Sequence, residues 1–225
     1  MLQAYFHRFR NWVGLRVYSK HRKFRVIYQE NLWGDAESRS GSGSNLANTA
    51  AIREEIPRLI ENYGIRSIFD APCGDFFWFR EMNLKIAYQG GDIVPDLIEA
   101  NRDLYEAENR KFIEFDLTND IAPGVDLILC RDALVHFSYQ DIRATLRNMR
   151  ASGATYLLTT TFASPDRKNK DILTGEWRPL NLQAAPFSFP PPLVSIDERY
   201  LAENGIFSDK TLGLWKISDL PIQEI

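Results

Sequence analysis

The sequence predicts an α/β fold built on an open, mostly parallel sheet with helices on both faces. Two observations lead to this prediction. Short apolar runs alternate with segments whose apolar residues recur every three or four positions, which is the pattern of strands joined by crossover helices. In addition, the first apolar run ends in an acid and a Pro/Gly turn, Asp70–Asp75. Open α/β sheets carry nucleotide sites at the carboxyl end of such a strand.

The expected elements follow one another along the middle of the chain. Strands are expected over residues 65–70, 87–93, 111–115, 125–130, 154–162 and 210–217. Helices are expected over residues 48–63, 95–108 and 139–151. We therefore assign residues 48–225 to one α/β domain and residues 1–47 to a segment in front of it.

The N-terminal segment contains two features. Aromatic and aliphatic residues between positions 2 and 13 recur at helical spacing with bases between them, which predicts a basic amphipathic helix. Two interpretations stay open: residues 1–25 contact an anionic membrane or a partner, or the helix packs on its own domain or on a second subunit, and packing of this kind is the commoner use of the pattern. The Ser/Gly-rich stretch Ser38–Ser44 is either a linker or a mobile lid.

Residues 163–196 interrupt the alternation. They contain six prolines and little periodicity, so we expect a substrate-side insertion of extended segments and not another strand–helix unit. Its aromatic and polar side chains are candidate contacts for an acceptor molecule: Glu176, Trp177, Arg178 and Asn181. Arg178 would suit a phosphate or carboxylate on that acceptor.

Composition excludes several classes of protein. No apolar run approaches the roughly 18 residues of a membrane span. Two cysteines make no disulfide framework, and no Cys/His spacing indicates a metal site, so we expect a reduced, cytoplasmic protein without a metal. Residues 1–29 hold seven bases and no acid, whereas the remainder holds 20 bases and 30 acids. An acidic body of this kind argues against a nucleic-acid partner.

Polar side chains follow the first and second expected strands, at the edge of the sheet where a ligand is expected to bind. The turn after the first strand consists of Asp70, Ala71, Pro72, Cys73 and Gly74. Gly74 would let backbone approach a ligand closely. Asp92 and Ile93 end the second strand, 22 residues after Asp70, where an acid is placed to accept hydrogen bonds from ribose hydroxyls.

Two further strand ends complete the set. Asp116 and Leu117 follow the third strand, where the acid suits an exocyclic amine such as adenine N6 and the leucine suits the ring. Arg131, Asp132 and His136 follow the fourth strand. Each acid alone has a structural alternative, such as capping the next helix or turn. Four polar strand ends at one edge of the sheet favour a ligand site.

These residues resemble the motifs of the class I S-adenosylmethionine-dependent methyltransferases. The likeness covers residues 64–162 and includes the acid–glycine turn 70–75, the ribose acid in 90–93, the adenine pair 116–117 and the segment 130–136. It implies a Rossmann-like seven-stranded sheet with an antiparallel C-terminal strand. It also implies that S-adenosylmethionine binds at these residues: Asp70, Ala71, Pro72, Cys73, Gly74, Asp92, Ile93, Asp116, Leu117 and Arg131.

Two further comparisons with the family concern the rest of the chain and the turn. The whole chain is similar to a bacterial subgroup through Asn31–Gly34, Ser40–Ser44, Trp177–Leu182 and Pro186–Phe187, and this subgroup indicates no substrate. The turn departs from the family's three alternating glycines, because Pro72 and Phe76 replace two of them. We expect Phe76 to place bulk near the amino-acid end of the cofactor.

The resemblance predicts methyl transfer to a small polar acceptor, and the insertion suggests a sugar or glycan hydroxyl. His136 and Asp132 are the candidate bases for removing the hydroxyl proton, although His136 also has a structural interpretation as a helix-start residue bonded to backbone. A non-catalytic module that binds a partner or membrane through its N-terminal helix is the alternative. A nicotinamide-dependent dehydrogenase fits less well, because the G-x-G-x-x-G turn is absent.

Overall fold

The computed structural model describes residues 18–200 and 205–222. Its helices are α2 (Lys20–Gln29), α3 (Ala50–Asn62), α4 (Pro95–Tyr105) and α5 (Tyr139–Ala151). Its strands are β1 (Ser67–Asp70), β2 (Ala87–Asp92), β3 (Arg110–Glu114), β4 (Leu127–Cys130), β5 (Tyr156–Phe162), β6 (Val194–Asp197) and β7 (Lys210–Lys216). Short 3₁₀ turns include η1 (Ser42–Ser44), η2 (Phe79–Met82), η3 (Leu134–His136) and η5 (Ile217–Asp219).

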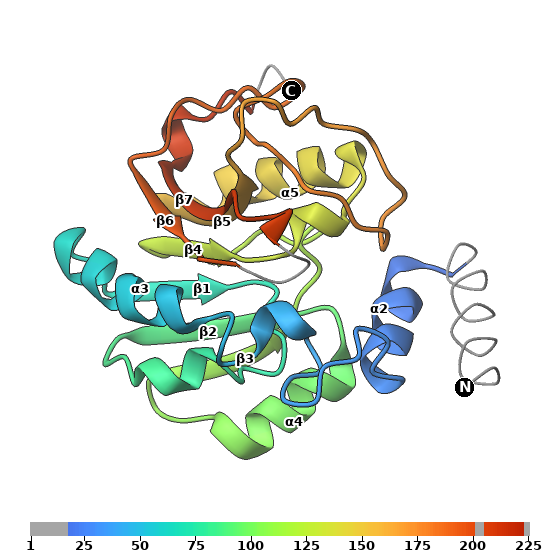
Figure 1. Cartoon of the computed structure of the whole chain (residues 1–225). Coiled ribbons are helices and arrows are strands. Elements are labelled where there is room, and N and C mark those ends of the chain that lie inside the picture. Colours follow the sequence, from blue (N-terminus) through green and yellow to red (C-terminus); the bar gives the residue numbers. More distant parts are fainter. Residues whose placement is uncertain (1–17, 201–204, 223–225) are drawn as a thin grey trace.

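The strands form one seven-stranded sheet in the order β3-β2-β1-β4-β5-β7-β6 (Figure 1). Strands β1 to β5 are parallel, and β7 is antiparallel to β5. The predicted mostly parallel, seven-stranded sheet with an antiparallel C-terminal strand is confirmed. The order reverses between β1 and β4, and such a reversal opens a crevice at the carboxyl ends of the strands.

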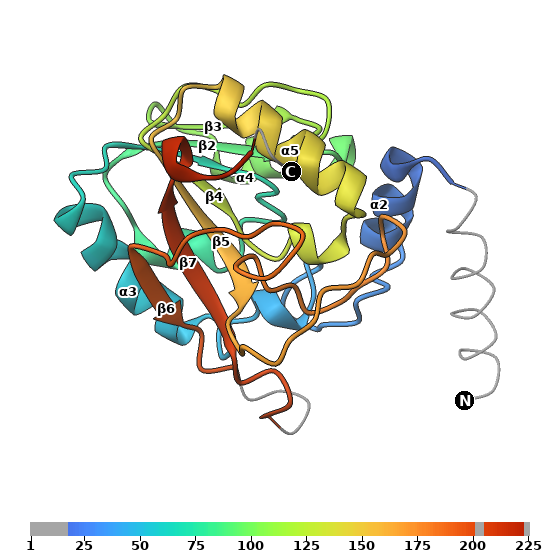
Figure 2. The ribbon, with the colours of Figure 1, turned by 90° about the horizontal axis from the view of Figure 1, so that it is seen from above.

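Alternation of side chains along the strands builds two cores, one on each face of the sheet. In β4, Ile128 and Cys130 pack on the α5 face, whereas Leu127 and Leu129 pack on the opposite face with α3 and α4. This period of two is what a strand buried on both faces requires. Figure 2 shows α5 and α3 on opposite sides of the strands.

The segment predicted as an insertion is part of the fold. Its apolar side chains Leu180, Leu182, Phe187 and Phe189 are buried in the core on the α5 face. At its end the chain enters β6, which pairs with β7. This edge strand, Val194–Asp197, is the seventh strand. It was not expected because it begins within the Pro-rich residues 163–196, for which no further strand was predicted.

Helix α2 was also absent from the expected elements. Its sequence is strongly polar, with Lys23 and Ile27 as its buried residues, so it lacks the wide apolar stripe by which a helix is recognised. The amphipathic helix predicted near positions 2–13 lies outside the described residues. Among the described helices, none is long and apolar enough to cross a membrane.

Candidate functional site

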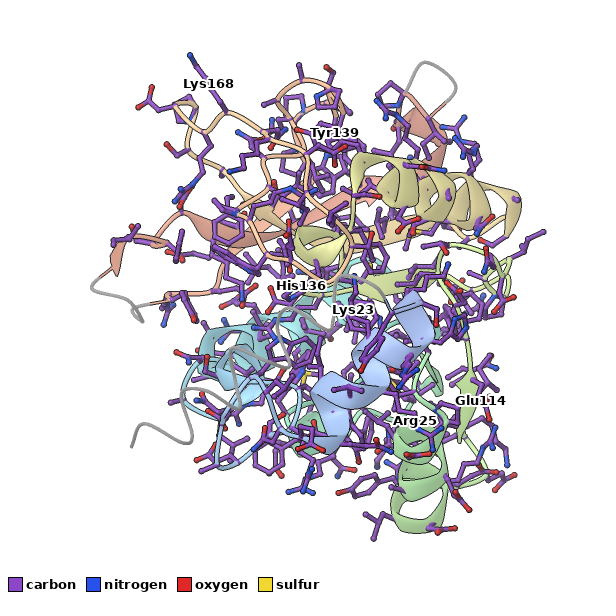
Figure 3. All side chains as sticks on the ribbon, turned by 90° about the vertical axis from the view of Figure 1, so that its right-hand side faces the viewer. Lys23, Arg25, Glu114, His136, Tyr139 and Lys168 are labelled. Carbon is purple, nitrogen blue, oxygen red and sulfur yellow. The ribbon has the colours of Figure 1, made fainter. Side chains whose placement is uncertain are left out.

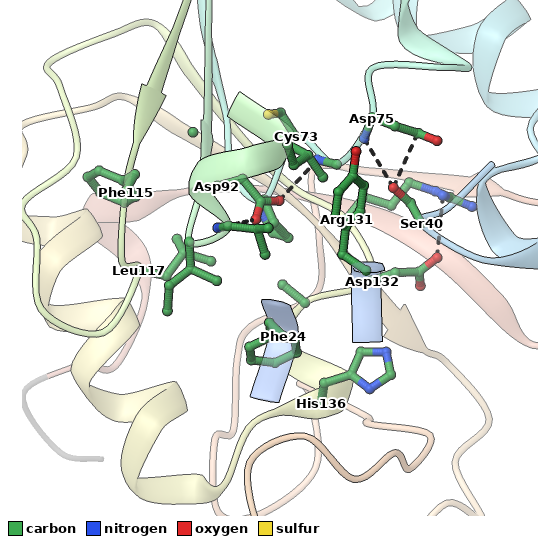
Figure 4. A pocket seen from close by; sticks show the side chains of 18 of the residues that line it. Phe24, Ser40, Cys73, Asp75, Asp92, Phe115, Leu117, Arg131, Asp132 and His136 are labelled. Carbon is green, nitrogen blue, oxygen red and sulfur yellow. Dashed lines mark hydrogen bonds and ion pairs between the residues drawn. The ribbon is translucent and has the colours of Figure 1, made fainter. Parts of the chain in front are cut away.

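A cavity lies at the carboxyl ends of the parallel strands, where Figure 1 places α2. Its volume is about 130 Å³, counted as space for the centres of water molecules. Nine of the ten predicted cofactor contacts line it: Asp70, Pro72, Cys73, Gly74, Asp92, Ile93, Asp116, Leu117 and Arg131. The tenth, Ala71, is buried in the core beneath the turn. Asp132 and His136 line the same cavity (Figure 4), so the four strand ends do converge on one space.

Asp70 and Asp92 are buried acids that line the cavity. Asp70 accepts a hydrogen bond from the Tyr88 hydroxyl at 2.8 Å, and burial raises its pKa to about 7. Asp92 accepts hydrogen bonds from the backbone amides of Gly74 (3.2 Å) and Val94 (3.1 Å), yet burial still raises its pKa to about 6. No ion pair joins either acid to a residue in the described part of the chain. Both therefore face the cavity without an ion pair to compensate their charge.

Asp116, just after β3, is held differently. Its carboxylate accepts hydrogen bonds from the Thr118 amide and hydroxyl, and the Lys20 ammonium of α2 pairs with it at 2.8 Å. Burial raises the pKa of Asp116, but these bonds outweigh it and leave the pKa below its usual range. Lys20 therefore already pairs with the carboxylate of Asp116, which we expected from the sequence to bind an adenine amine.

The Ser/Gly-rich stretch lies across the turn after β1. Ser38 Oγ donates to the Asp75 carboxylate at 3.0 Å, and the Asp75 amide donates to Ser40 Oγ at 3.1 Å. A Cβ on Gly74, whose φ is +54°, would lie 2.3 Å from Ser40 Oγ. Ser40 is therefore the residue that approaches Gly74 closely, and the lack of a side chain at Gly74 leaves room for the Ser/Gly-rich segment. Hydrogen bonds therefore hold this segment against the turn, and its interpretation as a lid or a linker stays a prediction.

A group of four charges lies beyond this segment: Arg131, Glu198 and Lys210 are buried and Asp132 is partly exposed, and Arg131 and Asp132 line the cavity. Arg131 pairs with Glu198 at 2.5 Å and with Asp132 at 3.3 Å. Lys210 Nζ pairs with Asp132 at 2.7 Å and with Glu198 at 3.3 Å. Arg131 also donates to the carbonyl of Gly43 at 2.7 Å, which ties the Ser/Gly segment to this wall. We call Arg131, Asp132, Glu198 and Lys210 the charge cluster.

Asp132 and His136 have different chemistry within this setting. Burial raises the pKa of Asp132, but Lys210 and Arg131 outweigh it and hold the pKa far below its usual range, so Asp132 is a fixed anion and a poor base. The Nδ1 atom of His136 lies 2.9 Å from the Glu176 carbonyl. A carbonyl only accepts, so Nδ1 carries the proton of the neutral ring and Nε2 remains free to accept one. Burial lowers the pKa of His136, which favours that neutral form.

Phe76 does not occupy the cavity. Its side chain is buried and packs against Phe79, Tyr88, Tyr105 and Phe112 on the α3–α4 face. Its positive φ of 56° turns the ring away from the turn. The expectation that Phe76 crowds the cofactor's amino-acid end is wrong, because the bulk lies in the core. Pro72, in contrast, does line the cavity.

None of the four predicted acceptor contacts lines the cavity. Arg178 and Asn181 are buried, and their side chains donate to backbone carbonyls. Trp177 is exposed and packs edge-on against Phe162 and Phe207. Glu176 contributes its carbonyl to His136. These positions favour structural roles for Arg178 and Asn181, and the predicted contacts with an acceptor remain predictions.

Aromatic residues from the N-terminal segment complete the cavity. Phe24 and Tyr28 of α2 and Trp33 line it, together with Trp78. Trp33 is 39% exposed and its ring lies 5.5 Å from that of His136. Trp33 belongs to the Asn31–Gly34 segment that resembled a bacterial subgroup, so a sequence signal existed for it. Nothing in the sequence placed Phe24 or Tyr28 at the strand ends, because α2 itself was not expected.

No family model matches the chain, and no curated protein matches it. Among solved structures, it is similar to magnesium protoporphyrin IX methyltransferase (ChlM) from Synechocystis PCC 6803 with bound SAH, with 13% identity over 65% of this chain and 74% of that one and a TM-score of 0.49. It is similar to the methyltransferase domain of bacterial CtHen1, with 13% identity, 52% and 67% coverage and a TM-score of 0.45. A third is the glycopeptide N-methyltransferase MtfA complexed with S-adenosyl-L-methionine, with 12% identity, 53% and 58% coverage and a TM-score of 0.44.

These structures are described as methyltransferases, which is the kind of protein that the sequence motifs resembled. The fold that the resemblance implied is confirmed by this chain's own sheet order and antiparallel C-terminal strand.

Proposed function

We propose that this protein is an S-adenosylmethionine-dependent methyltransferase that acts on a small polar acceptor. The observation that carries the proposal is the convergence of four successive strand ends on one cavity, with Asp70, Asp92, Asp116 and Asp132 in its lining. The likeness of the fold to methyltransferase structures supports the same reaction class.

The side chains in the cavity fit such a cofactor. Asp70 and Asp92 are buried acids without a described ion-pair partner, and burial raises their pKa values to about 7 and about 6. A ligand with hydroxyl donors and a positive charge would supply the compensation that these carboxylates lack. Ile93 and Leu117 supply an apolar wall suited to a nucleobase. When bound, S-adenosylmethionine supplies an already activated methyl group on its sulfonium.

The protein's own contribution is then position and proton transfer. Asp92 would accept hydrogen bonds from ribose hydroxyls, and Asp116 would face the adenine end. His136, neutral and protonated at Nδ1, would take the proton of an acceptor hydroxyl on Nε2. Asp132 stays ionised in the charge cluster and serves as a fixed negative charge beside the site. Most of the rate enhancement would come from holding donor and acceptor in line.

For the acceptor, we propose a sugar or glycan hydroxyl. The half-exposed ring of Trp33 lies next to His136 in the cavity lining, and a flat aromatic face gives a pyranose or similar ring an apolar surface to stack on. The alternative, a non-catalytic module that binds a partner through its N-terminal segment, would bind the cofactor without turnover on any acceptor.

Calorimetry with S-adenosylmethionine tests the cofactor site directly. We expect the wild-type protein to bind, and Asp92→Ala to lower the affinity about 10- to 100-fold, because a hydrogen bond to a charged group is worth about 1.5–3 kcal/mol. Affinity should rise between pH 5 and pH 8, since the raised pKa values of Asp70 and Asp92 keep part of the population protonated at acid pH.

A matched control lies on helix α4, which follows Asp92. Asp103→Ala removes an exposed acid of this helix that lies outside the cavity lining, and it should leave the affinity unchanged. Absence of binding by the wild-type protein to both S-adenosylmethionine and S-adenosylhomocysteine would remove the proposed function.

Lys20 offers a second test, because it already pairs with Asp116. If an adenine amine takes the place of its ammonium, Lys20→Met should strengthen cofactor binding about two- to fivefold, the equivalent of a partly exposed ion pair. Arg25→Met removes another link of α2, to Asp96 at 2.9 Å, without touching the cavity. Weaker binding in both variants, measured by the same calorimetry, would mean that Lys20 serves to close α2 and does not compete.

A further inference from the structure

Part of the predicted insertion is wrapped around the turn that carries His136. The Gly175 amide donates to the His136 carbonyl at 2.7 Å, and the Arg178 amide donates to the Val135 carbonyl at 3.1 Å. The Glu176 carbonyl accepts from His136 Nδ1 at 2.9 Å. Lys23 of α2 donates to the neighbouring Thr174 carbonyl, and Figure 3 shows this side of the molecule with Lys23 and His136 labelled. The orientation of the imidazole is therefore set by the backbone of residues 174–178.

The guanidinium of Arg178 spans the same turn. Its Nη1 donates to the carbonyl of Leu134 and its Nη2 to the carbonyl of Phe137, both at 2.9 Å. These two carbonyls stand on either side of His136 in the chain. A rigid, planar fork is suited to joining two acceptors at once, and a lysine ammonium on a flexible stem is not.

Because Arg178 is buried, its guanidinium has lost its hydration, and this desolvation is a large free-energy cost for stabilising a loop. The residue is 5% exposed, and no described carboxylate forms an ion pair with it. Its Nε has no hydrogen-bond partner among the described residues, and the ring of Tyr139, 5.8 Å from the guanidinium carbon, adds a cation–π contact. Burying a cation without a counter-ion is costly, so an apolar side chain of similar length would pack here at lower cost. The arginine is explained if its fork and charge act on His136.

We propose that Arg178 is a positioning residue, which joins the carbonyls of Leu134 and Phe137 so that His136 keeps its Nδ1 on the Glu176 carbonyl and presents a free Nε2. This inference deepens the proposed function and rests on it, because it concerns the base of that reaction.

The charges around His136 set the sign of the expected effect. Burial is the main cause that lowers its pKa, and Arg178 and Lys210 of β7 lower it further, whereas the hydrogen bond to the Glu176 carbonyl and the charge of Asp132 after β4 raise it. Lys23 of α2 faces the same loop and has its own pKa lowered by burial. Removing the Arg178 charge should therefore raise the pKa of His136, and loosening the turn should release its single tautomer.

Long-range ¹H–¹⁵N NMR of the full chain measures both properties, and the sequence holds just three histidines, His7, His21 and His136. In the wild-type protein we expect His136 to be protonated at Nδ1 and to titrate below the ordinary value of about 6.5. In Arg178→Met we expect a higher midpoint and a mixture of tautomers. Arg178→Lys, which keeps the charge without the fork, should recover the midpoint more than the tautomer.

Asn181→Ala is the matched control. Asn181 is buried in the same insertion and donates to the Ser164 carbonyl at 3.1 Å, away from the His136 turn. It should loosen the insertion and leave the His136 signals unchanged. An equal effect of Asn181→Ala, or unchanged His136 signals in Arg178→Met, would overturn the positioning role. Should Arg178→Met not fold, the loss of the single tautomer in Arg178→Lys decides the question.

The spectra are recorded without cofactor or acceptor, so this test of Arg178 is independent of the test of the proposed function. A protein that binds no S-adenosylmethionine but gives the expected spectra would lose the proposed function and keep the role of Arg178 in orienting His136. A protein that binds the cofactor and shows no response of His136 to Arg178 would lose the positioning role alone.

Discussion

Replacing His136 by glutamine is expected to lower the rate of methyl transfer by about 10²- to 10⁴-fold, the range of a general base, with cofactor affinity unchanged. Glutamine is close to histidine in size and can still donate to the Glu176 carbonyl that lies 2.9 Å from Nδ1. Glutamine has no basic nitrogen in the position of Nε2, so it cannot accept the proton. The change therefore removes the base and keeps the contacts that position the side chain.

The rate should also depend on pH in a stated direction. The neutral imidazole is the active form, so the rate should rise with pH through the pKa of His136 and then level off. Because burial lowers that pKa, the pH at which the rate is half-maximal should lie below ~6.5, the ordinary midpoint of histidine. A profile that falls instead as pH rises through this range would point to an acid in place of a base.

The rate can be measured with an acceptor that is still unidentified. Transfer of a labelled methyl group from S-adenosylmethionine to the small molecules and glycans of a cell extract, followed by identification of the labelled product, gives both rate and substrate. Asp141→Asn is a fitting control, because Asp141 is close to the same loop through Thr174 but lies outside the cavity lining. Full turnover in His136→Gln would remove His136 from the mechanism.

Much of the site could be predicted because its residues lie at the ends of strands with strong patterns. Asp70, Asp92 and Asp116 each lie at the end of an expected strand, and parallel strands bring their carboxyl ends to one edge of the sheet. The prediction for Phe76 was wrong because of the local backbone conformation at this residue. A positive φ at a bulky side chain is rare, and no sequence pattern signals that the backbone will take it and turn the ring into the core.

The role of Arg178 could not be predicted for a different reason. An arginine in a Pro-rich insertion is ordinarily exposed, and from sequence it suited an anionic acceptor. Its burial depends on the long-range packing of residues 174–178 against the turn Leu134–His136. Helix α2 was missed in the same way, because its position rests on contacts such as Lys20 with Asp116, which no local periodicity encodes.

The largest expected loss of stability follows from replacing Glu198 by glutamine. Glu198 has no exposed side-chain surface, and it faces both cations of the charge cluster, Arg131 at 2.5 Å and Lys210 at 3.3 Å. Without it, two buried cations share the single carboxylate of Asp132. Breaking a buried pair by removing one partner costs about 3–5 kcal/mol, which corresponds to roughly a 10 °C lower midpoint of thermal unfolding for a chain of this length.

Two comparisons separate this effect from the loss of any acidic residue. Glu54→Gln removes an exposed partner of Arg58 on α3 and should change the free energy of unfolding by less than about 1 kcal/mol. The double variant Glu198→Gln, Lys210→Met removes one charge of each sign, so it should recover part of the loss, since a smaller neutral group of charges remains. A double variant less stable than Glu198→Gln would show that Lys210 stabilises the fold through Asp132 alone.

Glu198→Gln should also affect the cavity. Arg131, which pairs with Glu198, donates to the carbonyl of Gly43 at 2.7 Å, so the loss of Glu198 should loosen the Ser/Gly segment over the cavity. Cofactor affinity should therefore fall along with stability.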